Sequence, residues 1–193
     1  MKTNIIIAGV GGQGILTIAA VLDTAALNEN LYVKQSEVHG MSQRGGAVES
    51  HVRISDSQVH SDLIPEGKAD LIVAVEPMES LRHLPFLKKG GTLITDAQTF
   101  VNMDNYPEKK ALYKTIQKYP HHLIINATEM AKALGNSKVA NIILLGAASV
   151  LLPLSEKSLI RAIESMFSSK GEKILALNLE AFYKGKELAL QMV

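Results

Sequence analysis

The sequence predicts a three-layer α/β/α fold built around a mostly parallel but mixed sheet. Short apolar runs alternate with amphipathic stretches along the chain, which is the pattern of wound α/β domains. A glycine-rich turn joins the first apolar run to the first amphipathic stretch, and a later run alternates polar and apolar residues as an antiparallel strand does. Because the 193 residues contain no long linker, repeat or low-complexity segment, we expect a single domain over residues 1–193.

Strands are predicted wherever apolar residues run together or alternate. Near-continuous apolar runs are typical of parallel strands that are buried on both faces. In Ala47–Ile54, Val48 and Val52 alternate with Glu49 and His51, which predicts an antiparallel or edge strand with one solvent-exposed face. We therefore expect His51 to be solvated or to lie at an interface. The predicted strands are Thr3–Ala8, Leu31–Gln35, Ala47–Ile54, Leu71–Val75, Thr92–Thr95 and Leu123–Asn126.

Helices are predicted from helical spacing and from capping residues. Pro77 suits the first turn of a helix, where its missing N–H costs nothing. Thr128 and Ser155 are predicted N-caps, and Gly135-Asn136 and Pro153 are predicted helix ends. The predicted helices are Ile15–Leu27, one that begins at Pro77, one from Thr128 to Leu134, Val139–Leu152, Ser155–Phe167 and a final one after Asn178.

Composition excludes several classes of function. The formal net charge is +1 and there is no run of Lys and Arg, so the chain lacks the basic surface that nucleic acid or an anionic membrane attracts. The absence of cysteine excludes disulfides, thiolate-bound zinc, iron–sulfur clusters on this chain and a thiol nucleophile. The six histidines show no metal-binding spacing. We expect no metal site, no nucleic-acid or membrane partner, and a cytoplasmic location.

A glycine-rich loop separates the first predicted strand from the first predicted helix. Its glycines let the backbone turn tightly and approach a ligand, and free N–H groups at a helix start attract phosphate or carboxylate. This is a Rossmann-like arrangement, although the acid that would bind ribose hydroxyls is not well placed, because Glu37 lies late, in an apparent loop. A tight turn that binds nothing explains the motif alone equally well. The candidate cofactor-binding residues here are Gly9, Gly11, Gly12, Gln13 and Gly14.

A second polar, glycine-rich loop is predicted from Glu37 to Gly46. Arg44 offers a planar fork of five donors suited to carboxylate or phosphate, and the flanking glycines leave backbone N–H groups accessible to an anion. Because both loops follow the carboxyl ends of strands, they are expected to meet at one rim of the sheet. A surface turn in which Arg44 pairs locally is the alternative. The candidate cofactor-binding residues are Ser42, Gln43, Arg44, Gly45 and Gly46.

Taken together, the two loops and the strand after them resemble the gamma-type domain of the 2-oxoacid:ferredoxin oxidoreductases. The form of the stretch from Glu37 to Gly46 is similar to the small (beta) subunit of the indolepyruvate type. The resemblance covers roughly residues 3 to 180. The segments that carry it are Gly9 to Ile15, Ser42 to Gly46, Ser50 to Ile54, Ala69-Asp70, Glu76-Pro77, Asn126 to Glu129, Asn141 and Gly146.

The resemblance implies that a large catalytic (alpha) subunit is the partner of this chain. That subunit would carry thiamine diphosphate and iron–sulfur clusters, and the complex would oxidatively decarboxylate an arylpyruvate, form acyl-coenzyme A and reduce ferredoxin. The chain itself has no cysteine and no Gly-Asp-Gly…Asn stretch of the thiamine type, so we assign it no catalytic residue and no cofactor of its own. Its expected role is to complete a ligand crevice, with coenzyme A as a shared substrate, and to support assembly.

Two other functions remain open on the sequence. One is a stand-alone NAD(P)-dependent, Rossmann-type oxidoreductase, which the single glycine motif allows. The other is a non-catalytic scaffold in which both loops are purely structural. Of the remaining polar residues, His39 can touch a ligand, whereas Glu76 and Asp96 either face the crevice or cap helices. The small residues from Gly146 to Ser149 indicate close helix packing.

Overall fold

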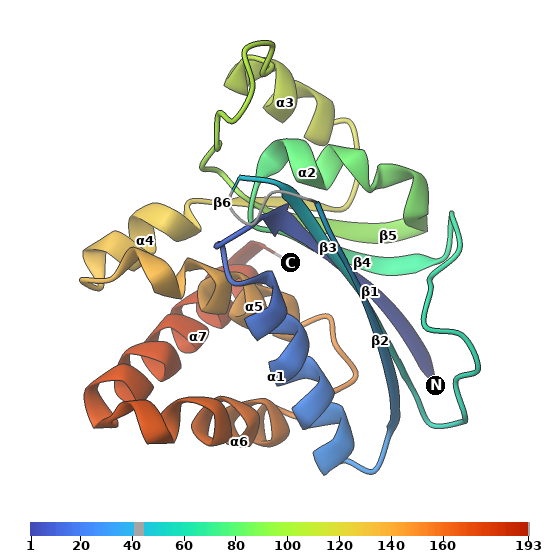
Figure 1. The fold of residues 1–193 in the computed structure, drawn as a ribbon, viewed down its shortest axis with the longest axis vertical. Helices are drawn as coiled ribbons and strands as arrows, with labels where there is room; N and C mark the ends of the chain where they lie inside the picture. Colours follow the sequence, from blue (N-terminus) through green and yellow to red (C-terminus); the bar gives the residue numbers. More distant parts are fainter. Residues whose placement is uncertain (41–44, 193) are drawn as a thin grey trace.

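The computed structural model describes residues 1–40 and 45–192 as three layers, with helices on both faces of one sheet (Figure 1). The six strands lie in the order β2-β3-β1-β4-β5-β6. The α/β/α architecture with a mixed sheet is therefore confirmed. The strands are β1 (Lys2–Val10), β2 (Tyr32–His39), β3 (Ala47–Ser55), β4 (Ala69–Ala74), β5 (Leu87–Asp96) and β6 (His122–Ile125).

Strand β3 runs against its neighbours, as the alternating sequence predicted. It pairs antiparallel with both β1 and β2, whereas β1, β4, β5 and β6 are mutually parallel. However, β3 lies inside the sheet and is not an edge strand. Strand β2 is the edge strand beside β3, and it continues through Glu37 to His39, where a loop was predicted. The polar ending of β2 has the composition of a loop because an edge strand can keep its side chains in water.

One face of the sheet is covered by a large apolar layer of helices. Their residues join Ile5, Ile7, Val52 and Val73 of the sheet in a single buried cluster. The helices of this face are α1 (Ile15–Asn28), α4 (Ala127–Ala133), α5 (Ala140–Ser149), α6 (Glu156–Phe167) and α7 (Glu172–Met192), with 3₁₀ turns at Ser137–Val139 and Ser168–Lys170.

The opposite face carries two short helices and a smaller apolar cluster around Ile6, Ile72 and Leu93 (Figure 1). Helix α2 (Pro77–Arg82) is followed by a 3₁₀ turn at Leu84–Phe86, and α3 (Lys109–Ile116) packs against α2. Helix α3 is not among the elements predicted from the sequence. In the part of the chain described, no helix combines the length and the apolar character needed to cross a membrane.

The helix boundaries confirm some predicted caps and correct others. Pro77 opens α2, and Ser155 caps α6 by accepting a hydrogen bond from the Ser158 N–H. Thr128 is not an N-cap: Asn126 holds that position, and Thr128 lies inside the first turn of α4. The last helix begins at Glu172, so that the buried Asn178 lies within it.

Helices α5 and α7 cross at backbone contact, where small residues were predicted to pack. A Cβ atom added to Gly146 would lie 2.0 Å from the carbonyl oxygen of Phe182. Likewise, a Cβ atom on Gly185 would lie 1.8 Å from the carbonyl oxygen of Ile143. The crossing therefore requires glycine on both helices.

The polar side of β3 is buried, so the predicted solvent-exposed face is wrong. His51 is 3% exposed and accepts a hydrogen bond from the Ile64 N–H through Nδ1, at 3.0 Å. Its ring meets the Phe86 ring edge-on at 5.4 Å between centroids. Burial lowers the pKa of His51, which favours the neutral ring. The chain that follows β3 folds back over the strand, and local alternation gives no sign of such a cover.

Candidate functional site

The two glycine loops meet where β1 and β2 end, at the rim formed by their carboxyl ends. Strands β1 and β2 both run antiparallel to β3, so their carboxyl ends lie at the same edge. The Gly11 N–H donates to the carbonyl oxygen of Gly46 at 2.8 Å, directly beyond the pair formed by Val10 and Ala47. The predicted rim of two adjoining loops is therefore present.

The first loop adopts a shape that needs its glycines. Gly12 and Gly14 have φ angles of +99° and +80°, in the region that favours glycine. Gln13 closes the loop, because its Oε1 accepts a hydrogen bond from the Val10 N–H at 2.7 Å. Gly9 leaves room for this contact, since a Cβ atom there would lie 2.8 Å from the same oxygen. Gly9 and Gln13 thus shape the loop, whereas Gly11, Gly12 and Gly14 line the adjoining pocket.

A residue far along the chain holds the start of α1 in place. The Nδ2 atom of Asn141, which is 5% exposed, donates to the carbonyl oxygen of Gly14 at 3.0 Å. A Cβ atom on Gly14 would lie 2.4 Å from that nitrogen. The loop and the first residues of α5 are therefore fitted to each other.

A pocket of about 520 Å³ opens beside the first loop. The N–H groups of Gly12, Gly14, Ile15 and Leu16 donate to no group among the described residues, and all four residues line the pocket. Pocket and helix start together form a site suited to an anion next to an apolar group. The residues that line it are Gly11, Gly12, Gly14, Ile15, Leu16, His39, Gly40 and Val48.

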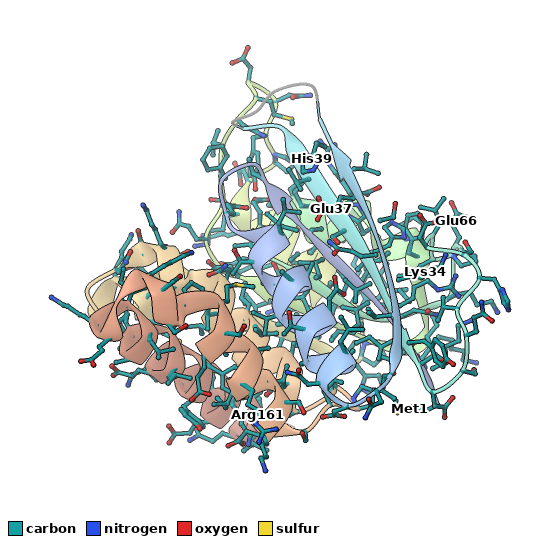
Figure 2. The ribbon with its side chains drawn as sticks, turned by 60° about the horizontal axis from the view of Figure 1, so that its bottom comes forward. Met1, Lys34, Glu37, His39, Glu66 and Arg161 are labelled. Carbon is teal, nitrogen blue, oxygen red and sulfur yellow. The ribbon has the colours of Figure 1, made fainter. Side chains whose placement is uncertain are left out.

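His39, a candidate ligand contact in the sequence, lies on the wall of this pocket. It comes from the end of β2, and its Nε2 lies 3.3 Å from Oε2 of Glu37 (Figure 2). Both residues lie on the edge strand β2, near the end of the strand that precedes the second glycine loop (Figure 2). Since β3 separates β2 from β1, Glu37 does not occupy the place of a ribose-binding acid on a strand adjacent to β1.

The second loop is only partly described. Ser42, Gln43 and Arg44 lie outside the described residues, so their candidate roles remain predictions. Gly45, with φ of +80°, and Gly46 are described, and Gly46 accepts the hydrogen bond from Gly11.

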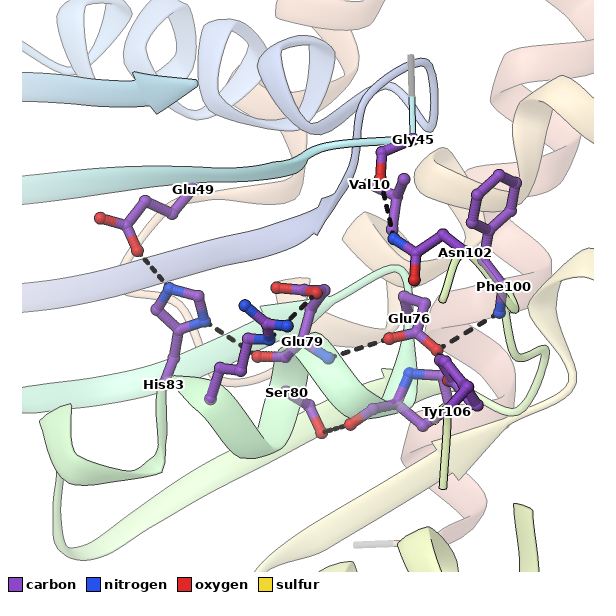
Figure 3. A network of polar contacts seen from close by, with 12 residues as sticks. Val10, Gly45, Glu49, Glu76, Glu79, Ser80, His83, Phe100, Asn102 and Tyr106 are labelled. Atoms are coloured by element: carbon purple, nitrogen blue, oxygen red, sulfur yellow. Dashed lines mark hydrogen bonds and ion pairs between the residues drawn. The ribbon is translucent and has the colours of Figure 1, made fainter. Parts of the chain in front are cut away.

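A segment distant in sequence contacts this second loop (Figure 3). No pattern in the sequence points to that segment. The Nδ2 atom of Asn102 donates to the carbonyl oxygen of Gly45 at 2.8 Å. The Phe100 ring lies near Gly45, since a Cβ atom there would be 3.9 Å from the ring. Residues 97–108 carry no motif and no regular periodicity, so only the fold brings them to the loop.

Glu76 anchors residues 97–108 to helix α2. Its carboxylate accepts hydrogen bonds from the Glu79 N–H at 2.9 Å, the Phe100 N–H at 3.3 Å and the Tyr106 hydroxyl (Figure 3). Glu76 is fully buried, and it is the N-cap of α2. Burial, together with the hydrogen bond to Glu76, raises the pKa of Tyr106, which keeps the hydroxyl protonated as a donor. Glu76 is therefore a helix cap and an anchor, and it does not line the pocket.

Asp96 plays a similar part at the end of β5. Its carboxylate accepts from the Thr128 N–H at 3.1 Å and the Gln98 N–H at 3.2 Å, and from the Thr128 hydroxyl. Burial raises the pKa of Asp96, whereas these hydrogen bonds act against that rise. Asp96 thus ties β5 to the first turn of α4, and it is not among the residues of the pocket.

Among residues 1–40 and 45–192 there is no group of three or more His, Asp or Glu side chains placed to hold a metal ion. The site as described consists of backbone N–H donors, apolar walls and His39. It is suited to binding and contains no nucleophile paired with a base. Such an arrangement can position an anionic ligand.

Comparisons with known proteins show the family to which the chain belongs. The family model for pyruvate ferredoxin/flavodoxin oxidoreductase matches residues 4–188. Indolepyruvate oxidoreductase subunit IorB of Thermococcus kodakarensis is 38% identical, over 98% of this chain and 97% of that protein. 2-Oxoglutarate synthase subunit KorC of Methanocaldococcus jannaschii is 34% identical, over 100% of this chain and 96% of that one.

Solved structures show the same fold. The gamma subunit of keto/oxoacid ferredoxin oxidoreductase from Geobacter sulfurreducens superposes with a TM-score of 0.73 at 29% identity, over 98% of this chain and 99% of that one. The 2-oxoglutarate:ferredoxin oxidoreductase of Magnetococcus marinus, solved with coenzyme A bound, gives a TM-score of 0.80 at 26% identity. This chain spans 32% of that longer chain. From the family match and the identity to full-length relatives, the chain belongs to the pyruvate ferredoxin/flavodoxin oxidoreductase family.

Proposed function

We propose that this chain is the small subunit of a 2-oxoacid:ferredoxin oxidoreductase of the indolepyruvate type. In the complex, a large subunit with thiamine diphosphate and iron–sulfur clusters would carry out the oxidative decarboxylation and pass electrons to ferredoxin. The small subunit would complete a crevice for coenzyme A at the glycine rim. The IorB and KorC relatives, which are themselves named as subunits, support this role. The family match over residues 4–188 also supports one domain over residues 1–193.

The contact between the loops carries the proposal. The hydrogen bond from Gly11 to Gly46 joins the two loops beside a pocket of about 520 Å³. Free N–H groups at the start of α1 suit a phosphate of coenzyme A, and Leu16 and Val48 offer an apolar surface. Arg44, which comes shortly before β3 in the sequence, would add a guanidinium to the same rim.

Co-expression with the large subunit tests the assembly role. We expect the two chains to copurify, and we expect turnover to need both. If they never copurify and the large subunit is fully active alone, the proposal fails.

A matched pair of variants on α1 tests the crevice. Leu16→Glu places a carboxylate at the pocket wall, where Leu16 is 39% exposed, so the substitution adds repulsion toward an anionic ligand. We expect the KM for coenzyme A to rise about tenfold while the complex still assembles. Leu27→Glu is the control, because Leu27 is an exposed leucine near the other end of the same helix. Equal effects of the two variants would remove the crevice from the proposal.

Arg44→Ala separates a working rim from a scaffold. We expect slower acyl transfer to coenzyme A with assembly unchanged. Arg161→Ala is the control, since Arg161 is an exposed arginine of α6 that lies far from His39 (Figure 2). Unchanged kinetics of Arg44→Ala with intact assembly would favour the scaffold role.

A further inference from the structure

A second pocket, of about 260 Å³, lies at the opposite ends of the strands from the glycine loops. It forms where β1 begins at Lys2 and β3 ends at Ser55, two residues that face each other across the strand pair. The other end of β1, at Val10, leads into the first glycine loop. A nine-residue strand separates the two pockets, which places them roughly 25–30 Å apart at the usual rise per residue. The second pocket is thus independent of the proposed coenzyme A crevice.

Arg53 is the central feature of this pocket. The residue is 6% exposed, yet among the described residues no carboxylate lies within ion-pair distance of its guanidinium. Its Nε donates to Oδ1 of Asn4 at 3.1 Å. Its Nη1 donates to the carbonyl oxygens of Ser61 at 2.8 Å and Leu63 at 2.9 Å. Arg53 therefore holds the segment after β3 against the pocket through these hydrogen bonds. Its positive charge has no carboxylate partner among the described residues.

One arm of the guanidinium is left for a solute. The Nη2 atom donates to no group in the described part of the chain, although Arg53 lines the pocket. A buried guanidinium without a counter-ion is costly, and an anion that accepts from the free arm would offset that cost. With Nε and Nη1 engaged, the two N–H groups of Nη2 are left to donate to phosphate oxygens, and the planar guanidinium fixes their direction.

The rest of the pocket wall adds no negative charge. Of the described residues that line the pocket, none is acidic. Lys2 adds an exposed ammonium group that has no ion-pair partner within residues 1–40 and 45–192. The nearby carboxylate of Asp56 is taken by the amino group of Met1. The remaining lining residues are uncharged or carry an imidazole, and they are Ser55, Ser57, Gln58, Val59, His60 and Ser61.

We propose that this pocket, formed by Arg53, Lys2 and the serines that follow β3, binds a phosphate group. The group is that of free inorganic phosphate or of a small phosphomonoester. Arg53 contributes the buried charge and the directed donors, Lys2 contributes a second charge, and the segment 57–61 closes around the ligand. The chain would then hold a phosphate group at the edge opposite its coenzyme A crevice.

A titration of the full chain with inorganic phosphate, followed by amide ¹H–¹⁵N chemical shifts, tests the site. We expect saturable shifts centred on residues 57–61, whether or not the amides of Gly11 to Leu16 at the glycine rim also shift. Lys2→Glu reverses an exposed charge that makes no side-chain ion pair among the described residues, and should weaken binding about tenfold. Arg53→Lys keeps the charge but loses the planar fork, and should also weaken binding about tenfold. Lys157→Glu, at an exposed position of α6, is the matched control and should bind as the parent does.

A comparison of two ligands distinguishes the two sources of the phosphate group. Equal affinity for inorganic phosphate and adenosine monophosphate indicates that the phosphate alone is recognised, whereas tighter binding of the nucleotide indicates a phosphomonoester. No shift at residues 57–61 up to about 50 mM phosphate overturns the site, because that bound leaves no affinity of use in a cell. Equal weakening by Lys2→Glu and Lys157→Glu overturns it as well. If Arg53→Lys does not fold, the Lys2→Glu comparison still decides. None of these results depends on coenzyme A binding, so the two proposals fail separately.

Discussion

The two faces of the sheet are built from different interactions. Ile5 and Ile7 of β1 point to the face of α1 and α5, into one large apolar cluster. On the face of α2, Asn4 of β1 and Arg53 of β3 are buried as well, but they are hydrogen-bonded to each other. Apolar contact is non-directional and stabilises in proportion to area, whereas hydrogen bonds fix atoms in direction. The first face should therefore dominate stability and the second should position the loops.

The polar face continues from β3 to the glycine rim (Figure 3). His83 pairs with Glu49 of β3, and its Nδ1 lies 2.9 Å from the carbonyl oxygen of Glu79. Glu79 is itself 1% exposed, and burial raises the pKa of its carboxyl. From Glu79 the contacts lead through Glu76 to the segment that holds Gly45. A chain of polar contacts thus links the middle of the sheet to the candidate site.

The largest effect is expected at the α5–α7 crossing of the apolar face. Gly146→Ala forces a methyl group to within 2.0 Å of the Phe182 carbonyl oxygen, so the helices must separate. We expect a loss of about 3–5 kcal/mol in the free energy of unfolding, measured by urea denaturation. Lys184→Ala, next to Gly185 but exposed, should cost less than about 0.5 kcal/mol. A small loss for Gly146→Ala would show that this crossing adjusts, and the contrast between the faces would weaken.

A smaller loss is expected when the anchor of the polar face is removed. Glu76→Ala leaves the Glu79 N–H, the Phe100 N–H and the Tyr106 hydroxyl without their acceptor. We expect a cost of about 2–4 kcal/mol, with Glu76→Gln recovering part of it because the amide oxygen still accepts. Glu66→Ala, at an exposed acid after β3, should leave stability unchanged. Stability of Glu76→Ala equal to that of the parent would contradict the anchoring role.

The ionised carboxylate of Asp23 on α1 destabilises the folded chain. Its removal therefore gives a prediction of opposite sign. Burial, aided by the charge of Glu37, raises the pKa of Asp23 from 3.8 to about 6, and its Oδ1 has no hydrogen-bond partner among the described residues. A raised carboxyl pKa means that stability is lost as the pH rises from about 4 through 6. Asp23→Asn should therefore stabilise by about 1–2 kcal/mol at pH 7.5, after a discount for partial exposure, and hardly at all below pH 4. Denaturation at both pH values checks this, and equal gains at both would rule out titration of Asp23 as the cause.

The smallest effect on stability should accompany a change in ligand binding. Asn102→Ala removes one exposed hydrogen bond to Gly45, so we expect a loss below about 0.5 kcal/mol. If the loop forms the proposed crevice, the KM for coenzyme A should still rise about threefold to tenfold, with kcat little changed. Asn105→Ala, an exposed neighbour, is the control. An unchanged KM would separate the polar network from ligand binding.

Much of the fold follows from local sequence, because the buried stretches of the parallel strands are apolar and the two glycine loops follow strand ends. The failures have physical reasons. Helix α3 buries only Leu112 and Ile116, so its pattern is weak. Asn178 is a poor helix former, but its Nδ2 is satisfied by the carbonyl oxygen of Ile174 inside α7. His51 is buried by chain that returns over β3, which no local pattern reports.

The candidate site, too, could be predicted only in part from the sequence. That Gly11 and Gly46 adjoin could be expected, because both loops follow parallel strand ends. The roles of Asn102 and Glu76 could not, since each acts across a long sequence separation: 57 residues from Asn102 to Gly45 and 30 from Glu76 to Tyr106. A motif shows which backbone can bind, whereas the side chains that hold it come from elsewhere in the chain.

The hairpin between β2 and β3 has a consequence for the design of variants. Its two ends are pinned by the pair of His39 with Val48 and by the bond from the Gly40 N–H to the Ala47 carbonyl oxygen at 2.9 Å. The intervening residues can therefore be exchanged as a cassette, since the register of the sheet is set outside them. Under the proposed function, transplanting residues 41–44 from a 2-oxoglutarate-type relative would test whether this segment sets ligand preference.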